Sequence, residues 1–268
     1  MSIVSGSPPA APASMGGLSS AVEDLSVLPE LNSLRFDGSS YLSKIYSTSL
    51  SNNLISLSFW VKRSEISTYQ ELFGRVIDSS GNLYTKFRFS NDTIDYRSWD
   101  QGRLTNAVSN NLFRDSNSWY HILLTVRMET GVDQVKIYVN GLEISYNQQT
   151  SDGQTNDKIT IFNNNTNNLG NVATQIGNGF KGYLANIHFI DGQALSSGYF
   201  GEYDSTGTIW IPKAFDGTSS TGGSTVSTDY GTNGFLLDFS SISGTTINDT
   251  APIDTNHSSA NNWTATGF

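Results

Sequence analysis

A strand-and-turn pattern near the middle of the chain constrains the fold more than any other feature. In residues 135–139 apolar and polar side chains alternate, so the valine and isoleucine side chains share one face of an extended strand. Asn140 and Gly141 follow directly, and these residue types readily adopt the positive φ that both central positions of a type I′ turn require. A second apolar, β-branched run occupies residues 120–126. The centre of the chain is therefore predicted to be an antiparallel meander.

The same period of two recurs along most of the chain. It is clearest in residues 55–61, where Ile, Leu, Phe and Val fall on one face. We count about ten to twelve strand candidates with hairpin-like spacing and no intervening helix. The 268 residues include no cysteine, so the fold must rest on a hydrophobic core rather than on disulfides. These observations predict an all-β fold, an antiparallel two-sheet sandwich.

Some segments carry more specific expectations. Residues 72–77 and 83–89 are predicted to form a hairpin, and residues 93–99 a further strand. Residues 159–162 are predicted to be a short strand, and the asparagine-rich residues 163–168 a solvated loop. In the strand 183–190 the alternation predicts two faces: Leu184, Asn186, His188 and Ile190 on one, and Tyr183, Ala185, Ile187 and Phe189 on the other.

The first 33 residues differ from the rest. Residues 2–17 are small, Pro-containing and nearly uncharged, which predicts an extended arm. Residues 20–23 have capping-box spacing, and a short amphipathic helix is expected over residues 20–28 before Pro29. Its apolar face comprises Leu18, Val22, Leu25 and Leu28. Two roles remain open for this arm: a strap on its own domain, or an anchor that docks on a neighbouring subunit.

The charge of the chain excludes some classes of partner. The net charge is −9, and clustered Lys and Arg residues are absent, so binding to nucleic acid phosphates is not expected. No apolar run approaches the roughly 20 residues that cross a bilayer, so membrane insertion is not expected either.

The order of the strand motifs resembles a known family. The motifs in residues 34–42, 56–61, 119–122, 135–141 and 182–189 are similar to those of laminin-G-like, concanavalin-A-like jelly rolls. The resemblance covers residues 34–195. It implies a jelly-roll sandwich there, preceded by the arm (1–33) and followed by a loop-rich C-terminal extension (196–268) packed on the sandwich.

The C-terminal extension carries a second resemblance. Its motifs are similar to the C-terminal segment that accompanies this domain in structural proteins of tailed bacteriophages, including phages of marine and cyanobacterial hosts. The motifs are residues 189–196, 200–202, 210–213, 230–235, 237–239 and 261–263. This resemblance implies a non-enzymatic virion protein, assembled in the host cytoplasm and forming a homo-oligomer.

Two placements in the virion are open. As a capsid-surface decoration or head-fibre protein, the chain would dock on other virion proteins through its arm. As a tail-fibre or receptor-binding component, it would bind a glycan on the host surface. The chain shows no coiled-coil heptads or β-helix repeats for a long shaft, which favours decoration.

A jelly roll can also be a glycoside hydrolase, which needs two nearby carboxyl groups. The only Glu-x-Asp triplet is Glu202-Tyr-Asp204, and no third acid follows it. The three histidines, His121, His188 and His257, lie far apart in the sequence and outside metal-binding or catalytic motifs. The sequence therefore predicts no catalytic residues.

Two kinds of binding site are considered instead. A single calcium ion could be held by acidic side chains in loops or at strand ends. The candidates are Asp78, Asp100, Asp152 and Asp191. The sequence has no dense acidic motif, so no cofactor is expected. A glycan could stack on aromatic side chains beside polar groups. The candidates for that site are Tyr96, Trp99, Asp100 and Arg103.

Overall fold

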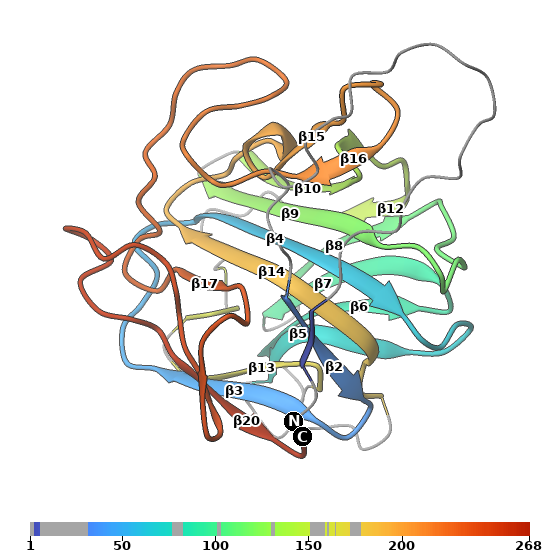
Figure 1. The fold of residues 1–268 in the computed structure, drawn as a ribbon. Helices are drawn as coiled ribbons and strands as arrows, with labels where there is room; N and C mark the ends of the chain where they lie inside the picture. The colour runs from blue at the N-terminus through green and yellow to red at the C-terminus, as the bar shows by residue number, and fades with distance from the viewer. Residues whose placement is uncertain are drawn as a thin grey trace, which may run out of the picture.

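Two antiparallel β-sheets pack face to face in the computed structural model (Figure 1). The structure describes residues 3–5, 32–76, 83–100, 103–129, 132–150, 159, 161–163, 165–171 and 178–268. The predicted all-β, antiparallel two-sheet sandwich is confirmed. Among the described residues the helical segment is the single 3-10 turn η2 (Ser197–Tyr199).

The first sheet has eight strands. In spatial order they are β1 (Ile3–Ser5), β2 (Asn32–Asp37), β14 (Lys181–Asp191), β4 (Leu54–Arg63), β9 (Tyr120–Glu129), β10 (Val132–Val139) and β11 (Leu142–Glu143), with β17 (Phe235–Leu237) also paired to β14.

The second sheet has ten strands. In spatial order they are β12 (Tyr146–Thr150), β8 (Arg103–Ser109), β7 (Thr93–Asp100), β6 (Leu83–Ser90), β5 (Gln70–Val76), β13 (Asn165–Leu169), β3 (Tyr41–Tyr46), β20 (Trp263–Thr266), β19 (Thr246–Ile247) and β18 (Ile242–Ser243). A separate hairpin of β15 (Gly201–Tyr203) and β16 (Trp210–Pro212) lies outside both sheets.

The core lies between the two sheets and is rich in aromatic rings. Phe59 of β4 packs against Phe73 of β5, with ring centroids 4.7 Å apart, and against Phe87 of β6 at 5.9 Å. All three side chains are fully buried. Each such burial stabilises the fold by roughly 1.5–3 kcal/mol, so the core needs no disulfide or metal to hold the sheets together.

The central hairpin forms as predicted. Strands β9 and β10 are antiparallel partners, and β10 turns into β11 through Asn140 and Gly141. Their φ values of 48° and 86° are those of a type I′ turn. The Asn140 side chain also accepts a hydrogen bond from the His121 amide (2.8 Å). This turn therefore fixes the register of the hairpin.

Strand β14 departs from its prediction at Asn186. The register with β4 shifts between Ala185 and His188, and Asn186 has a φ of 46°. Such a bulge inserts one extra residue and moves all following side chains to the opposite face. The predicted unbroken alternation is therefore wrong: Leu184, Ile187 and Phe189 all lie in the core between the sheets, whereas Ala185 and Ile190 pack on the outer side.

The asparagine-rich segment is a strand rather than a loop. The predicted solvated loop at residues 163–168 is wrong, because β13 lies between β3 and β5. Asn167 is fully buried, and its side chain accepts a hydrogen bond from the Phe162 amide (2.7 Å). The strand predicted at residues 159–162 is also wrong, since Phe162 lies in a turn with a φ of 54°.

The C-terminal extension is built into the sandwich rather than only packed on it. β17 pairs with β14 of the first sheet, and β20 pairs with β3 of the second. Several side chains of the extension lie in the main core: Phe235, Leu237, Phe239, Ile247, Trp263 and Ala265. Residues 34–195 and 196–268 therefore share one core.

The described part of the N-terminal arm pairs with its own sheet. Strand β1 lies antiparallel to β2, with Ile3 opposite Leu34. The predicted helix at residues 20–28, with Leu18, Val22, Leu25 and Leu28, lies outside the described residues, so its role stays a prediction. No helix in the described part of the chain is long and apolar enough to span a membrane.

Candidate functional site: the outer face of the ten-stranded sheet

Three neighbouring strands, β6, β7 and β8, present chemically distinct faces. Their inward side chains are apolar or small, whereas most of the outward side chains are aromatic, charged or amide-bearing. We call these outward side chains the outer platform. It comprises Tyr84, Lys86 and Arg88 from β6, Asp95, Arg97 and Trp99 from β7, and Leu104, Asn106 and Val108 from β8.

One end of the outer platform is aromatic. Tyr84 and Trp99 are direct cross-strand partners, and Leu104 lies opposite Trp99 on the next strand. All three side chains are half-buried, so part of each remains accessible. Half-exposed rings at neighbouring positions of a sheet give an apolar surface with fixed geometry, on which a planar or ring-shaped ligand can stack.

Two ion pairs hold the opposite end of the outer platform. Lys86 contacts Glu71 of β5 at 3.1 Å, and both nitrogens of the Arg88 fork contact one oxygen of Asp95 at 2.9 and 2.8 Å. Both carboxylates are almost completely buried, with exposed side-chain fractions of 1% and 2%. A buried carboxylate needs such a partner to stay charged, so these pairs position the platform side chains.

Three buried polar atoms of the outer platform have no hydrogen-bond partner among the described residues. They are Oδ1 of Asp95, Nε of Arg97 and Oδ1 of Asn106. Arg97 and Asn106 are cross-strand partners, and Asp95 lies two residues before Arg97 on the same face. Buried polar atoms are normally paired, so an unpaired cluster indicates a place that ligand or ordered water completes.

A row of small or polar side chains extends the platform across the sheet. From Lys86 the register runs to Gly74 of β5, then to Asn168 of β13, Ser43 of β3 and Thr264 of β20. Gly74 has no side chain, and the others can donate and accept hydrogen bonds. The row therefore runs across the sheet, perpendicular to the strands, and carries side chains that can form hydrogen bonds from β6 to β20.

The structure separates the residues predicted for a glycan site. Tyr96 is fully buried in the core, on the opposite face of β7 from Trp99, so these two rings cannot form one surface. Trp99 lies on the outer platform. Asp100 and Arg103 are cross-strand partners beside it, but their side chains lie outside the described ones. Tyr96 is therefore a correction to the predicted set, because strand alternation turns it inward.

The sequence prediction missed Tyr84, Arg97 and Asn106 as members of this surface. Arg97 precedes Trp99 by two residues in the predicted strand 93–99, so strand alternation could have singled it out. The other two come from adjacent strands, and the pairing that brings them beside Trp99 becomes visible only in the sheet.

His121 of β9 is fully buried between the eight-stranded sheet and the β15–β16 hairpin that packs on it. Its Nδ1 accepts a hydrogen bond from Trp210 Nε1 (3.0 Å), so its protonated Nε2 donates to Ser58 Oγ (2.8 Å). Burial lowers the pKa of His121 to about 3. His188, hydrogen-bonded to the Tyr230 hydroxyl (2.7 Å), likewise has its pKa lowered by burial to about 4. Both are neutral packing residues.

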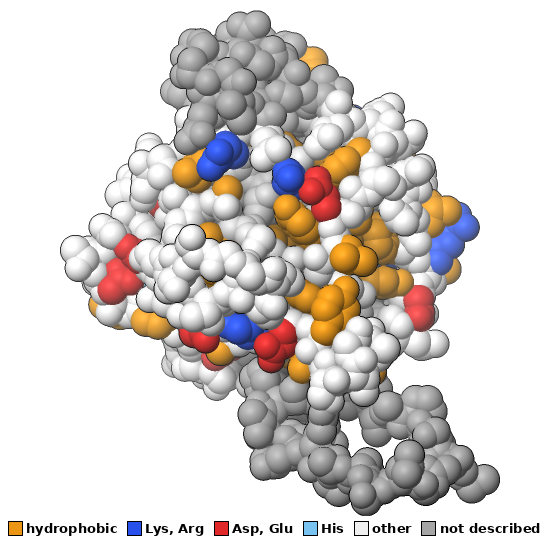
Figure 2. Space-filling model, turned by 90° about the horizontal axis from the view of Figure 1, so that it is seen from above, with side chains coloured by type: hydrophobic (Ala, Val, Ile, Leu, Met, Phe, Trp, Pro, Cys, Tyr) orange, Lys and Arg blue, Asp and Glu red, His pale blue; other side chains and the backbone are white. Residues whose placement is uncertain are grey.

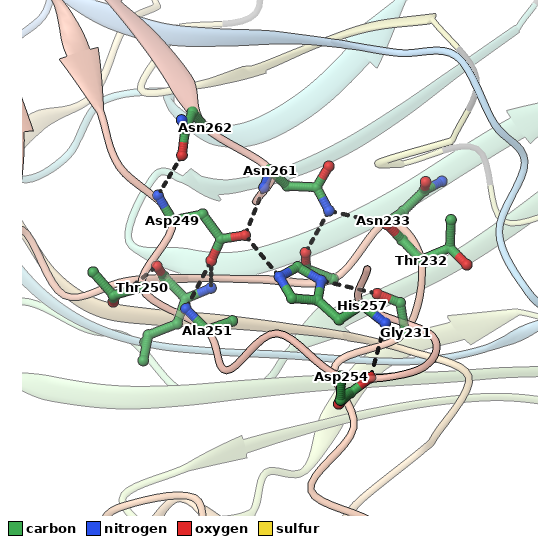
Figure 3. A network of polar contacts seen from close by, with 12 residues as sticks. Gly231, Thr232, Asn233, Asp249, Thr250, Ala251, Asp254, His257, Asn261 and Asn262 are labelled. Carbon is green, nitrogen blue, oxygen red and sulfur yellow. Dashed lines mark hydrogen bonds and ion pairs between the residues drawn. The ribbon is translucent and has the colours of Figure 1, made fainter. Parts of the chain in front are cut away.

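His257 belongs to a polar network that anchors the C-terminal extension (Figure 3). Its Nε2 lies 3.1 Å from Asp249, and its Nδ1 contacts the Gly231 carbonyl at 3.2 Å. Burial alone would lower the pKa of His257, but the hydrogen bond and charge of Asp249 raise it. Asp249 also accepts hydrogen bonds from backbone amides, those of Leu236, Ala251 and Asn261. The network is structural.

The predicted acidic candidates are occupied by the fold or lie outside the description. The Asp191 carboxylate accepts hydrogen bonds from Ser51 and from the Asn233 amide, and burial raises its pKa. Asp78 and Asp152 fall outside the described residues, which contain no cluster of metal-ligating side chains. Asp204 accepts hydrogen bonds from its own turn, at Thr206, Thr208 and Ile209.

A second surface, over β11 and the β15–β16 hairpin, is apolar. Hydrophobic side chains gather on the face seen from above (Figure 2), and these elements expose Leu142, Tyr203 and Ile209. Tyr203 packs edge-on against Trp210, with centroids 5.1 Å apart, and Trp210 in turn stacks on His121. The apolar surface is therefore connected to the buried His121 through Tyr203 and Trp210.

The comparisons with known proteins agree on the fold. A family model described as the concanavalin A-like lectin/glucanases superfamily matches residues 36–199. No curated protein matches the chain. A Bacteroides ovatus protein, whose description proposes carbohydrate binding, is similar in structure, with a TM-score of 0.53 and 14% identity over 88% of this chain and 58% of that one.

Two other solved structures are less similar. One is a heptameric SAP-like pentraxin of Limulus polyphemus, with a TM-score of 0.45 and 15% identity over 61% of this chain and 77% of that one. The other is domain 4 of an extracellular arabinanase from Geobacillus stearothermophilus in complex with arabinotriose, with a TM-score of 0.46 and 19% identity over 61% and 72% of the two chains.

Proposed function

The chain belongs to the concanavalin A-like lectin/glucanase superfamily, and on that premise we propose that it is a non-enzymatic protein that binds carbohydrate on its outer platform. The observation that carries this proposal is the cluster of unpaired polar atoms on Asp95, Arg97 and Asn106 beside the half-exposed rings of Tyr84 and Trp99. Sugars combine apolar ring faces with hydroxyl groups, so they match a surface of this kind.

The state of the carboxylates supports binding rather than hydrolysis. Retaining hydrolysis needs one carboxylate free to attack and one carboxyl group able to donate a proton. On this face Glu71 and Asp95 are each held in an ion pair with a cation. Glu202 and Asp204, the only acidic pair with suitable sequence spacing, lie on and beside β15, on the outer side of the eight-stranded sheet.

The proposal is tested with a glycan array and the Trp99→Ala variant. We expect the wild-type protein to bind a subset of glycans, and the variant to lose the signal while keeping its melting temperature, because Trp99 is only half-buried. Tyr203→Ala, an exposed aromatic residue on another surface, is the control and should bind as the wild type does. An array without signal, or binding that survives Trp99→Ala, would contradict the proposal.

For the biological setting, the proposal is a phage virion structural protein, either a capsid-surface decoration or a tail-fibre component. This proposal is supported by the resemblance of the C-terminal motifs to the C-terminal extension that accompanies this domain in structural proteins of tailed bacteriophages. Two of those motif residues make side-chain hydrogen bonds to backbone carbonyls. Asn233 joins the extension to the sandwich through Thr48 and Phe162, and Asn261 bonds within the extension to Thr232 and Gly234. A C-terminal extension with the same fold in those phage proteins would need the same contacts.

Quantitative mass spectrometry of purified particles tests the virion setting. Hundreds of copies per particle would favour capsid decoration, in which the arm docks on other virion proteins. A few dozen or fewer would favour a tail or vertex position. Absence of the chain from particles would contradict this part of the proposal and leave carbohydrate binding to be judged by the array.

A further inference from the structure

The charges on the outer platform do not balance. Glu71 is paired with Lys86, and Asp95 is paired with both nitrogens of the Arg88 fork. Arg97 lies farther away, with 3.7 Å between its terminal nitrogen and the Asp95 oxygen that Arg88 already contacts. Three cations thus share two carboxylates, and the excess positive charge resides on Arg97.

Arg97 is also the platform cation with the most freedom to bind. Its side chain is 32% exposed, compared with 12% for Lys86 and 16% for Arg88. Its Nε is buried and makes no hydrogen bond to the described residues. A guanidinium with spare donors in a planar fork is suited to a carboxylate or sulfate, which it can contact through two parallel hydrogen bonds.

The spacing between Arg97 and Trp99 matches the size of one sugar residue. The two side chains share a face of β7, and positions i and i+2 of a strand are about 6.8 Å apart. A pyranose ring that stacks on Trp99 can therefore place a substituent beside Arg97. Asn106, the cross-strand partner of Arg97, is buried beneath this position, and its side-chain carbonyl has no hydrogen-bond partner among the described residues.

From this geometry we infer that the ligand of the outer platform is an acidic glycan, whose carboxylate is bound by Arg97. The inference rests on the proposed carbohydrate-binding function and adds its chemical class. The net charge of −9 gives the chain no general attraction for anions, so selectivity for an acidic sugar must come from this local arrangement.

Calorimetry with matched oligosaccharides tests the inference. The probes are oligomers of galacturonate, glucuronate and mannuronate, each beside its methyl ester, which keeps the ring and removes the charge. We expect the wild-type protein to bind at least one acid about tenfold more tightly than its ester, as a charge-assisted pair would give. Arg97→Gln should abolish this preference for the acid over its ester, and Arg97→Lys should retain part of it.

Arg35→Gln, which removes an exposed arginine from β2 of the other sheet, is the matched control and should keep the preference. Equal binding of acid and ester by the wild type would overturn the inference, as would a preference that persists in Arg97→Gln. If the wild type binds neutral glycans on the array and none of the acids, the inference fails while the proposed function stands. If it binds no glycan at all, both fail.

Discussion

At the scale of single residues, Gly141 joins the central turn to the packing around Trp210. Its φ is 86°, and a Cβ at this position would lie 2.5 Å from the Trp210 ring. An alanine there meets both backbone strain and overlap with a ring that is itself hydrogen-bonded to His121. The turn prediction from Asn140 and Gly141 was correct, but this second constraint depends on a side chain about 70 residues away.

Gly141→Ala is expected to lower the free energy of unfolding by about 2–4 kcal/mol, the sum of the two effects. Gly207→Ala is the matched control: its φ is 70°, but a Cβ there would meet nothing within 4 Å. It should cost only about 1 kcal/mol. Urea denaturation measures both, and equal losses in the two variants would contradict the role assigned to Trp210.

The buried histidines make stability depend on pH. In the folded chain the pKa of His121 is lowered to about 3 and that of His188 to about 4, whereas in the unfolded chain both are near 6.5. Their contribution is therefore present above about pH 6.5 and is lost as the pH falls, because only the unfolded state takes up the protons. His257 has the opposite shift, and its contribution is lost as the pH rises through its folded pKa.

Between about pH 6 and pH 5 the free energy of unfolding should thus fall by about 1.4 kcal/mol per pH unit for each of His121 and His188. His188→Gln should halve this slope, whatever its effect on absolute stability. The measurement is urea denaturation at several pH values. An unchanged slope in the variant would show that His188 does not titrate as its burial requires.

At the scale of elements, the edge of the eight-stranded sheet is protected by side chains of the other sheet. The Tyr146 hydroxyl of β12 accepts a hydrogen bond from the Ile137 amide of β10 (2.8 Å), and the Gln149 side chain donates to the Val135 carbonyl (2.7 Å). These bonds satisfy backbone groups that an edge strand otherwise leaves open to pairing with another chain.

Tyr146→Phe should therefore lower the free energy of unfolding by about 1–2 kcal/mol, since the Ile137 amide loses its partner. It should also increase self-association, which size-exclusion chromatography detects. Tyr203→Phe, at an exposed position on β15, is the control and should change neither quantity. A variant as stable and monodisperse as the control would contradict the protective role of Tyr146.

The elements that could be predicted from the sequence are those with unbroken alternation. Strand β4 forms where predicted because Ile55, Leu57, Phe59 and Val61, at a period of two, all face the main core. The β9–β10 hairpin also forms where predicted. The bulge at Asn186 could not be predicted, since a single residue in the left-handed region leaves the composition of the strand unchanged. Strand β13 was missed because its buried Asn167 is stabilised by hydrogen bonds rather than by apolar character.

The candidate site was predicted only in part, because the sequence shows which residues share a face of one strand but not which strands are neighbours. Trp99 could be placed on an outer face from the alternation of β7, but its neighbours Tyr84 and Asn106 depend on strand pairing. Tyr96 was assigned to the site although the same alternation turns it into the core.

At the scale of the whole molecule, the sandwich depends on its C-terminal extension. Phe235, Leu237 and Trp263 are fully buried in the main core. Loss of one such large apolar side chain typically costs about 2–5 kcal/mol, which is comparable to the total stability of a marginally stable domain. By contrast, removing residues 1–31 leaves β2 whole, because that strand begins at Asn32.

A chain truncated after residue 195 is therefore expected not to fold, whereas a chain that lacks residues 1–31 should remain folded. Circular dichroism during thermal unfolding distinguishes the two. A cooperative transition in the truncated chain would mean that residues 34–195 form an independent domain. Loss of particle incorporation by the folded chain without residues 1–31 would further support the arm as an anchor.

Hydrogen–deuterium exchange with and without a saturating glycan from the array tests whether the outer face of the ten-stranded sheet binds carbohydrate. We expect slower exchange confined to peptides of β6, β7 and β8, which carry the outer platform. Slower exchange confined to β4, β9 and β14 of the opposite sheet, or no change anywhere in the presence of bound glycan, would contradict it.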